Sequence, residues 1–227
     1  MRWIITFMAA AIISTSASAL GLSDLSNADA SGGLKEALIQ GAGKAVGKLG
    51  AVDGFFKNPQ VKIPLPDSMK KAEKVMRTFG MGKQADELVL RMNRAAEAAV
   101  PEAQALLVNS VKQMSVTDAK NNLTGGDDAA TQYFKKTTSA PMAEKFLPIV
   151  KKATEDVKLA QQYDKFAATG VKYGLVKKDQ ANLEEYVTQK SLDGVYLMMA
   201  QEEKAIRANP MGQASGLLQK VFGAIGK

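Results

Sequence analysis

The sequence predicts an all-α protein, an irregular multi-helix bundle with a proline-rich extended crossing near its N-terminus. Three observations lead to this prediction. Apolar residues recur at helical spacing along most of the chain, no stretch shows a convincing run of period-two alternation, and the β-branched residues are scattered. Because the chain contains no cysteine, helix packing must stabilise it without disulfides.

The first 19 residues predict a cleavable secretion signal. Met1 and Arg2 form a short positive region, an apolar run extends to Ile13, and Ala17-Ser18-Ala19 fits a cleavage site. A membrane-spanning helix needs about 20 apolar residues, so this run is too short to be an anchor. We therefore expect an exported mature chain that begins at Leu20.

The rest of the chain predicts one domain preceded by a flexible segment. Residues 20–32 are mostly small and polar and predict a mobile lead-in. Residues 33–227 predict a single helical domain. Within it, residues 53–66 contain three prolines, which forbid a helix and favour extended chain. This crossing is also a candidate sub-boundary inside the domain.

The helix expected over residues 33–50 is rich in glycine. Gly41, Gly43 and Gly47 each cost about 1 kcal/mol relative to alanine in a helix interior. Such a helix is either packed very closely against a neighbour or loose, and the sequence leaves both alternatives open.

Further helices follow the prolines. The spacing of Ser115 and Asp118 fits a capping box that opens a short helix, and Thr124 to Asp127 has the same spacing and predicts a helix that runs through Lys136. Asn182 is a favourable N-cap for a long helix that ends near Arg207. The other main expected helices cover residues 67–79, 83–100, 142–152 and 216–223.

Positive charge is concentrated near the N-terminus. Residues 33–83 hold ten basic residues and four acidic ones. Such a surface attracts an anionic envelope component, such as phospholipid, lipopolysaccharide or acidic glycan, although a solvated face that aids solubility explains it equally well. Nucleic acid is not an expected partner, because export separates the chain from it and no aromatic-basic motif occurs. The lysines proposed for this contact are Lys35, Lys44, Lys48, Lys70, Lys71 and Lys74.

The absence of histidine and cysteine excludes several kinds of site. A Ser-His-Asp triad, a Cys-His pair and a zinc, copper or haem site with His or Cys ligands all need these residues. Catalysis would rest on Asp, Glu, Lys, Tyr, Ser or Thr, and a metal would be a hard cation such as calcium. No cofactor is expected.

A glycine-rich turn is the first candidate site. Gly125 and Gly126 precede an expected helix start, where backbone N–H groups can bind an anion. Asp127 and Asp128 suit a hard cation better. Capping by Thr124 and Asp127 explains the same spacing without any ligand.

The second candidate lies on the long helix from Asn182. Glu202 continues a stripe that is otherwise apolar or small, and a buried carboxylate needs a partner. A structural ion pair with Arg207, near Glu203, or a helix end that emerges into solvent explains this position. The alternative is a cleft in which Glu202, Asp193 and the two aspartates of the glycine turn converge, for acid–base work on a glycan or for a divalent ion.

Four stretches of the sequence are distinctive: KIPLP at 62–66, MNRAAEAAVPEA at 92–103, LTGGDDAATQYF at 123–134 and LDGVYLMMAQEEKAIRANP at 192–210. They closely resemble an exported bacterial family catalogued as "domain of unknown function 4197". The resemblance covers nearly the whole mature chain. It implies a periplasmic location in a Gram-negative cell and one helical domain, and it implies no activity, ligand or catalytic residue.

These observations favour a periplasmic, non-catalytic binding or structural module of the cell envelope. One alternative is a carboxylate-based hydrolase or divalent-cation-binding protein that uses the acidic residues named above. A second alternative is a protein that binds anionic membranes through the basic N-terminal region and the amphipathic segment at 216–227, which otherwise docks on the bundle.

Overall fold

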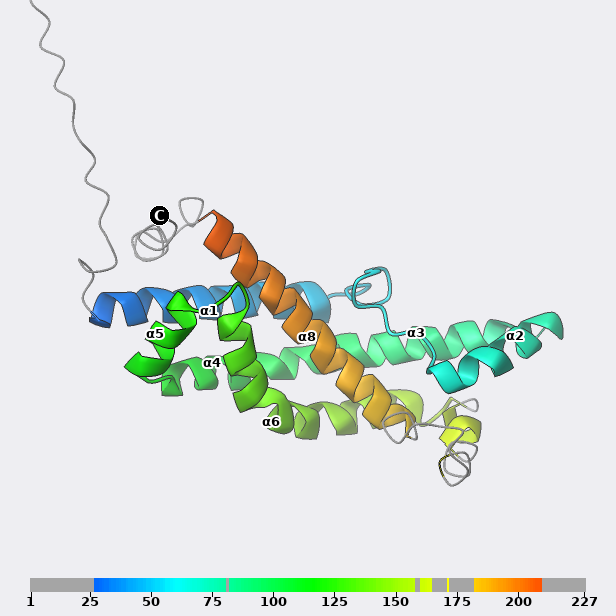
Figure 1. The fold of residues 1–227 in the computed structure, drawn as a ribbon. Coiled ribbons are helices and arrows are strands. Elements are labelled where there is room, and N and C mark those ends of the chain that lie inside the picture. Colours follow the sequence, from blue (N-terminus) through cyan, green and yellow to red (C-terminus); the bar gives the residue numbers. More distant parts are fainter. Residues whose placement is uncertain (1–26, 81, 158–159, 165–170, 172–181, 210–227) are drawn as a thin grey trace, which may run out of the picture.

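The computed structural model describes residues 27–80, 82–157, 160–164, 171 and 182–209 (Figure 1). In these residues the chain forms helices and no strand, which confirms the all-α prediction. None of the helices in this part of the chain is both long enough and apolar enough to cross a membrane. The expected signal at 1–19 and the expected last helix at 216–223 lie outside the described residues.

The helices pack into one irregular bundle. Helix α8 crosses the bundle diagonally against α1, α3 and α6, while α4 and α5 lie at one end and α2 lies at the other (Figure 1). The helices are α1 (Asn27–Gly50), α2 (Lys70–Thr78), α3 (Gly82–Ala99), α4 (Ala103–Gln113), α5 (Val116–Thr124), α6 (Ala129–Thr154) and α8 (Leu183–Ala208), with 3-10 turns η2 (Asp67–Met69) and η3 (Val100–Glu102).

A single hydrophobic core runs through the bundle. The proline-rich crossing at 53–66 contributes Phe55 and Ile63 to it, both fully buried. The same core contains Leu34 and Leu49 from α1 and residues from α3, α4, α5, α6 and α8. The crossing therefore lies inside the packed domain and does not separate two cores. Its first half forms consecutive turns, so only residues 62–66 have the extended, irregular course that the prolines predict.

Helix α1 begins earlier than the sequence predicts. It starts at Asn27, so residues 27–32 of the expected flexible lead-in are helical, and Ser31 is buried. The polar composition of this stretch suggested a mobile segment, but its first turns continue the helix that packs on the bundle. Residues 20–26 of the lead-in lie outside the described part of the chain.

The α1 glycines differ in how closely a neighbouring element approaches them. A Cβ atom added at Gly41 would lie 3.8 Å from Cδ1 of Ile206 on α8. One added at Gly50 would lie 3.2 Å from Cγ of Pro101. At Gly47, by contrast, a Cβ atom would meet nothing within 4 Å. Helix α1 is thus packed rather than loose, with Leu34, Ala42, Ala45 and Leu49 buried, but only Gly50 meets its neighbour closely enough for glycine to matter.

The capping predictions were right at two helix starts. Ser115 and Asp118 form a complete capping box: each side chain accepts a hydrogen bond from the other residue's backbone N–H, at 3.0 and 3.1 Å. Asn182 caps α8, because its side-chain oxygen accepts a hydrogen bond from the N–H of Glu185 at 2.8 Å. Helix α8 ends at Ala208, close to the expected end.

The capping prediction at Thr124 was wrong. Thr124 is the last residue of α5, and its hydroxyl donates to the carbonyl of Lys120 at 3.0 Å, a bond that competes with capping the next helix. Helix α6 begins at Ala129 after Asp128, whose side chain makes no capping bond. A Cβ atom at Gly125 would lie 2.6 Å from that of Ala129, so the tight α5–α6 turn requires glycine there.

Helix α6 replaces two helices that the sequence predicts. It runs without interruption from Ala129 to Thr154 and contains Pro141 and Pro148. Each proline removes a helix hydrogen bond and costs about 3 kcal/mol in a helix interior. A continuous buried stripe at four-residue spacing offsets that cost and holds the two halves together: Phe134, Thr138, Met142, Phe146 and Val150.

Candidate functional site

Glu97 on α3 fixes the start of the proline-rich crossing. It is 4% exposed, and its Oε1 atom accepts hydrogen bonds from the N–H groups of Phe55 and Phe56, at 3.0 and 3.1 Å. Arg94 donates to the other carboxylate oxygen of Glu97 and to Asp53. Asp53 has a φ of 70°, a conformation that non-glycine residues rarely adopt. These bonds hold a tight turn that would be strained by itself.

The charges around this turn are matched. A hydrogen bond from Lys57 and a second from Arg94 lower the pKa of the Asp53 carboxyl below its ordinary value. The hydrogen bond from Arg94 to Glu97, and to a smaller extent the one to Asp53, raises the pKa of the Arg94 guanidinium. Both groups therefore stay charged at neutral pH, and the turn keeps its ion pairs.

Asn93 fixes the end of the crossing. It is fully buried, its Oδ1 atom accepts from the N–H of Ile63 at 2.8 Å, and its Nδ2 atom donates to the carbonyl of Ile63 at 2.9 Å. The amide thus pairs with the extended chain as one residue of a neighbouring strand would. Residues 62–66 belong to no helix or sheet, so the backbone N–H and carbonyl groups of Ile63 need another partner when they are buried. The Asn93 amide supplies it.

Helix α8 holds the crossing from the opposite side. The hydroxyl of Tyr186 donates to the carbonyl of Pro64 at 3.1 Å, a contact between residues 122 positions apart. At Gly194, a Cβ atom would lie 2.7 Å from the ring of Phe55, so only glycine allows the crossing to come this close to α8.

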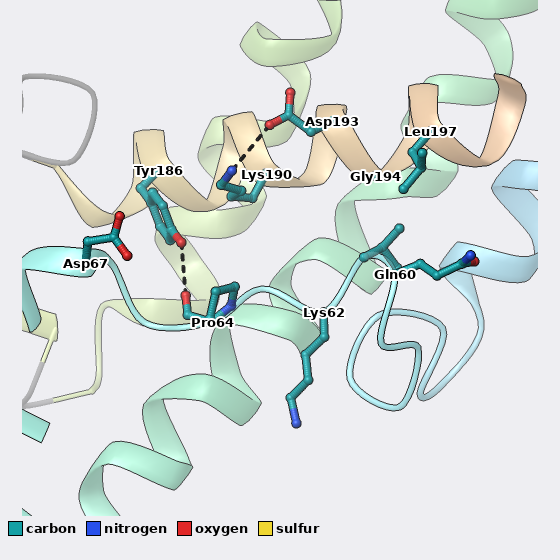
Figure 2. Close-up of a pocket in the computed structure, with 10 residues that line it drawn as sticks. Gln60, Lys62, Pro64, Asp67, Tyr186, Lys190, Asp193, Gly194 and Leu197 are labelled. Carbon is teal, nitrogen blue, oxygen red and sulfur yellow. Dashed lines mark hydrogen bonds and ion pairs between the residues drawn. The ribbon is translucent and has the colours of Figure 1, made fainter. Parts of the chain in front are cut away.

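A groove lies between the crossing and α8 (Figure 2). Its volume is about 310 Å³, and Tyr186 closes one end by bonding to Pro64. Leu197, 41% exposed, lies at the other end beside Gln60 (Figure 2). The wall residues are Gln60, Val61, Lys62, Pro64 and Asp67 from the crossing and its C-terminal end, and Tyr186, Lys190, Asp193, Gly194 and Leu197 from α8.

The groove presents both signs of charge and a neutral phenol. Burial, with a smaller contribution from Asp67, raises the pKa of Tyr186 to about 12, so the phenol stays protonated at neutral pH. The Lys190 ammonium lies 3.6 Å from the Asp193 carboxylate, and both are about half exposed. Asp67 and Asp193 lie at separate places along the groove (Figure 2). The groove therefore contains donors, acceptors and an apolar end but no pair of adjacent carboxylates.

A second hollow lies on the other side of the crossing. Its volume is about 550 Å³, and it is bounded by the crossing and by α2 and α3. Lys62 and Pro64 border both hollows, and the Lys62 ammonium lies 4.4 Å from the centre of the Phe56 ring, in the second one. The exposed edge of the crossing is thus flanked by concave surface on both sides.

Of the acids predicted for α8, Glu203 and not Glu202 is the buried one. Glu203 is 7% exposed and accepts hydrogen bonds from the N–H groups of Ala130 and Thr131 at the start of α6, and from the Thr131 hydroxyl. Arg207 donates to the same carboxylate with two nitrogens. The stripe that predicted burial of Glu202 drifts around the helix, so that position 203 faces the core at this end.

Arg207 extends this contact to the C-terminal end of α5. It donates to the carbonyls of Asn122 and Leu123, at 2.7 and 3.1 Å. The Glu203–Arg207 pair therefore joins the end of α5 to the start of α6, around the predicted glycine turn. A structural ion pair was one of the two interpretations left open for this region, and the geometry at Glu203 supports it.

The other predicted site residues take separate places. Glu202 pairs with Lys48 on α1, and Asp127 lies 3.7 Å from Lys204 in an exposed pair. Asp128 accepts from the side chain of Gln132, and Gly126 is exposed. Asp193 is about three helical turns from Glu203 along α8, roughly 15 Å at the usual rise per residue. In the described ranges, no three acidic side chains gather closely enough to hold a metal ion.

The lysines proposed for an anionic partner are dispersed. Lys48 is engaged by Glu202 and Lys70 by Asp67, whereas Lys44 and Lys74 are exposed and Lys35 is half-buried. The side chain of Lys71 lies outside the described part of the structure. Their partner stays a prediction.

Asn93 and Glu97 were missed by the sequence analysis. They lie on α3 at a spacing of four residues, among its buried apolar residues, and MNRAAEAAVPEA includes both. An asparagine and a glutamate four apart among alanines, on a helix that follows a proline-rich segment, were the available signal.

Comparisons with known proteins identify a family. The profile of a family described as "Protein of unknown function (DUF4197)" matches residues 24–223. No curated protein and no solved structure matches the chain.

Proposed function

Because the chain belongs to the DUF4197 family, whose description carries no activity, we propose from the geometry of its groove that it is a non-catalytic binding module. The expected signal at residues 1–19 supports the further proposal that it acts in the bacterial cell envelope. The groove between the crossing and α8 is the proposed binding site. The observation that supports this most directly is that buried side chains hold both walls of the groove before any ligand arrives.

A groove of this kind favours binding because its shape is already fixed. Asn93 and Glu97 fix the crossing on α3, and Tyr186 fixes it on α8. Since little side-chain or loop ordering is then needed, less of the interaction energy is lost on binding. A volume near 310 Å³ is at the lower end of the range for small-molecule sites.

The wall residues suggest the class of ligand. Lys190 can exchange its contact with Asp193 for a carboxylate of the ligand, and Asp193 can likewise bind an amino group of the ligand. Leu197 offers an apolar surface at the open end. A short peptide carries both charges, backbone amides and an apolar side chain. We therefore propose peptide segments as the ligands.

Titration with a defined pool of hexapeptides that have free termini, followed by amide chemical shifts, tests this proposal. We expect the largest shifts at Lys190, Gly194 and Leu197 and at least a tenfold weaker affinity for Leu197→Glu. Leu147→Glu is the matched control, because Leu147 is a similarly exposed leucine on α6 that borders neither hollow. Shifts confined to other surfaces would contradict the groove, and cleavage of the peptides would contradict a non-catalytic role.

The envelope location is tested separately. We expect the intact mass of the protein from a periplasmic extract to correspond to a chain that begins at Leu20. A chain that retains Met1 and stays in the cytosolic fraction would contradict this part of the proposal.

A further inference from the structure

The hairpin of α2 and the start of α3 projects away from the rest of the bundle (Figure 1). Helix α2 packs against α3 and against η2. The two helices are joined by a short turn in which Gly80 has a φ of 77°, a conformation that glycine adopts without strain. Residues 77–80 are all exposed, so the turn forms a tip directed into solvent.

The hairpin is held closed by Arg77. Its guanidinium donates to Glu73 on α2 at 2.8 Å and to Asp86 on α3 at 2.5 Å. The hydrogen bond to Asp86, followed by the one to Glu73, raises the pKa of Arg77. The two acids largely neutralise the charge of its guanidinium. The tip therefore has a defined shape, although these ion pairs are on the surface.

A large aromatic residue lies at the tip. Phe79 is 73% exposed, more than any other aromatic side chain in the described residues. Because it lies in a projecting turn, its ring can contact a membrane or a partner protein without any movement of the bundle. An exposed aromatic residue at such a position is typical of a contact with a partner or a membrane.

Uncompensated positive charge flanks this phenylalanine. Lys74 on α2 and Lys83 on α3 are exposed and form no ion pair with residues that the structure describes. Across the whole of α2 there are four basic residues and one acidic residue. A second copy of the hairpin would bring like charges together, whereas an anionic surface complements them.

We propose that the α2–α3 tip, with Phe79 between Lys74 and Lys83, docks on anionic phospholipid membranes. The Phe79 ring enters the boundary between headgroups and acyl chains, and the two ammonium groups bind the lipid phosphates. One aromatic ring and two lysines give weak, reversible binding, because stable anchoring needs a longer lipid-soluble group or a second signal. This contact is independent of the groove, so either proposal can fail without the other.

A single tryptophan at the tip tests the proposal in the mature chain that begins at Leu20. The one tryptophan of the sequence, Trp3, belongs to the expected signal, so Phe79→Trp in this background places a sole reporter at the tip, and no apolar signal segment is left to bind the vesicles. With phosphatidylcholine vesicles that contain about one third phosphatidylglycerol, we expect a blue shift of its emission that salt reverses. Neutral phosphatidylcholine vesicles should give little shift.

Two further variants make the test specific. We expect Lys74→Gln with Lys83→Gln to weaken vesicle binding at least tenfold, since each lysine near an anionic surface contributes about fivefold. Val116→Trp, in the same background, is the matched control, because Val116 is an exposed apolar residue on α5 at the other end of the bundle. It should show no shift, and circular dichroism should show that all variants remain helical.

Several outcomes would overturn the proposal. One is the absence of any shift with anionic vesicles. Another is equal binding by the lysine variant, which would move the contact to a different surface of the chain. A shift that depends on protein concentration without vesicles would assign the tip to a second copy or a protein partner.

Discussion

Glu97 and Glu203 solve the same problem at two different places in the molecule. Each is a buried glutamate on a helix, each accepts hydrogen bonds from two consecutive backbone N–H groups, and each pairs with an arginine on its own helix. Glu97 holds the irregular crossing that forms the groove. Glu203 holds the start of α6, where the partial positive charge of a helix N-terminus also favours a carboxylate.

The two contacts differ in how the carboxylate oxygens are used. At Glu97 both backbone groups bind Oε1, and Arg94 binds the other oxygen. At Glu203 each oxygen accepts a different backbone group, and Oε1 also accepts from Arg207. An amide can therefore replace the first carboxylate with little loss but cannot replace the second. The comparison shows that the cost of replacing a buried acid by its amide depends on how its two oxygens share their donors, and not only on its burial and charge.

Glu203→Gln should give the largest loss of stability. Whichever way the amide is oriented, its NH₂ group meets a backbone donor, and Arg207, only 13% exposed, loses the charge of Glu203 beside it. We expect a loss of about 3–5 kcal/mol, as for other broken buried ion pairs. Urea unfolding followed by circular dichroism measures it.

Glu202→Gln is the matched control for this change. The Glu202 side chain is 14% exposed, but its partner Lys48 on α1 is 59% exposed and water can solvate the ammonium once the carboxylate is gone, so we expect a smaller loss of about 1 kcal/mol. Equal losses at the two positions would show that the buried network at Glu203 does not have the importance assigned to it.

Asn93→Ala should give the second largest effect. It leaves the N–H and carbonyl groups of Ile63 without their partner in a buried place, at a cost of about 2–4 kcal/mol in total. Amide hydrogen exchange should become faster at residues 61–65 before the rest of the protein opens. Asn121→Ala, at an exposed position on α5, is the control and should change stability by less than about 0.5 kcal/mol.

Glu97→Gln should have a smaller effect and separates the two glutamates. The amide oxygen can still accept from Phe55 and Phe56, and Arg94 is 36% exposed, so water can solvate it. We expect a loss of about 1 kcal/mol for Glu97→Gln but about 3 kcal/mol for Glu97→Ala, which removes both acceptors. At position 203 the two substitutions should cost nearly the same. Similar ratios at both positions would contradict the distinction.

Tyr186→Phe should have the smallest effect at neutral pH, about 1 kcal/mol for one hydrogen bond to Pro64. The raised pKa makes this contribution depend on pH. Because the folded state keeps the phenol proton up to about pH 12 while the unfolded phenol loses it near pH 10, folding binds a proton in this interval. The stability of the wild type should therefore fall more steeply than that of Tyr186→Phe from pH 10 to 12.

Tyr133→Phe is the control for the alkaline experiment. Tyr133 makes a longer bond of 3.5 Å, to the carbonyl of Ser110, and is only partly buried. Its removal should leave the steep alkaline decline in place. The difference in phenolate absorbance between the wild type and Tyr186→Phe, measured along the alkaline titration, isolates the Tyr186 phenol from the other four tyrosines.

Local features of the sequence predicted most of the helices, for physical reasons that act over one or two turns. The box at Ser115 and the cap at Asn182 depend only on neighbouring residues, and both predictions were confirmed. The errors arose where a distant contact decides. The sequence predicted two helices, one through Lys136 and one over 142–152, but the buried stripe along α6 joins them into one helix despite Pro141 and Pro148.

The site was less predictable because its contacts are far apart in the sequence. Helical spacing predicted a buried acid at the end of α8, but at position 202 instead of 203. The periodicity of a stripe within α8 does not show where its partner helix α6 begins, and that position decides which acid is buried. The groove depends on Tyr186 meeting Pro64, and no pattern within α8 or the crossing specifies that contact. The glycine turn and the end of α8 do lie together, as one of the alternatives required, but they meet through Glu203 and Arg207.

The position of α8 in the chain has a consequence for biosynthesis. This helix is the last one described, yet it packs on α1, supplies one wall of the groove and caps α6 through Glu203. A nascent chain cannot complete the burial of α1 or the start of α6 until α8 has been made, although α1 already meets α4 and α5. A ribosome-bound intermediate that ends before residue 183 should therefore be more open to proteases than the finished chain. If the chain is exported as we propose, this order of folding makes it easier for a secretion channel to thread.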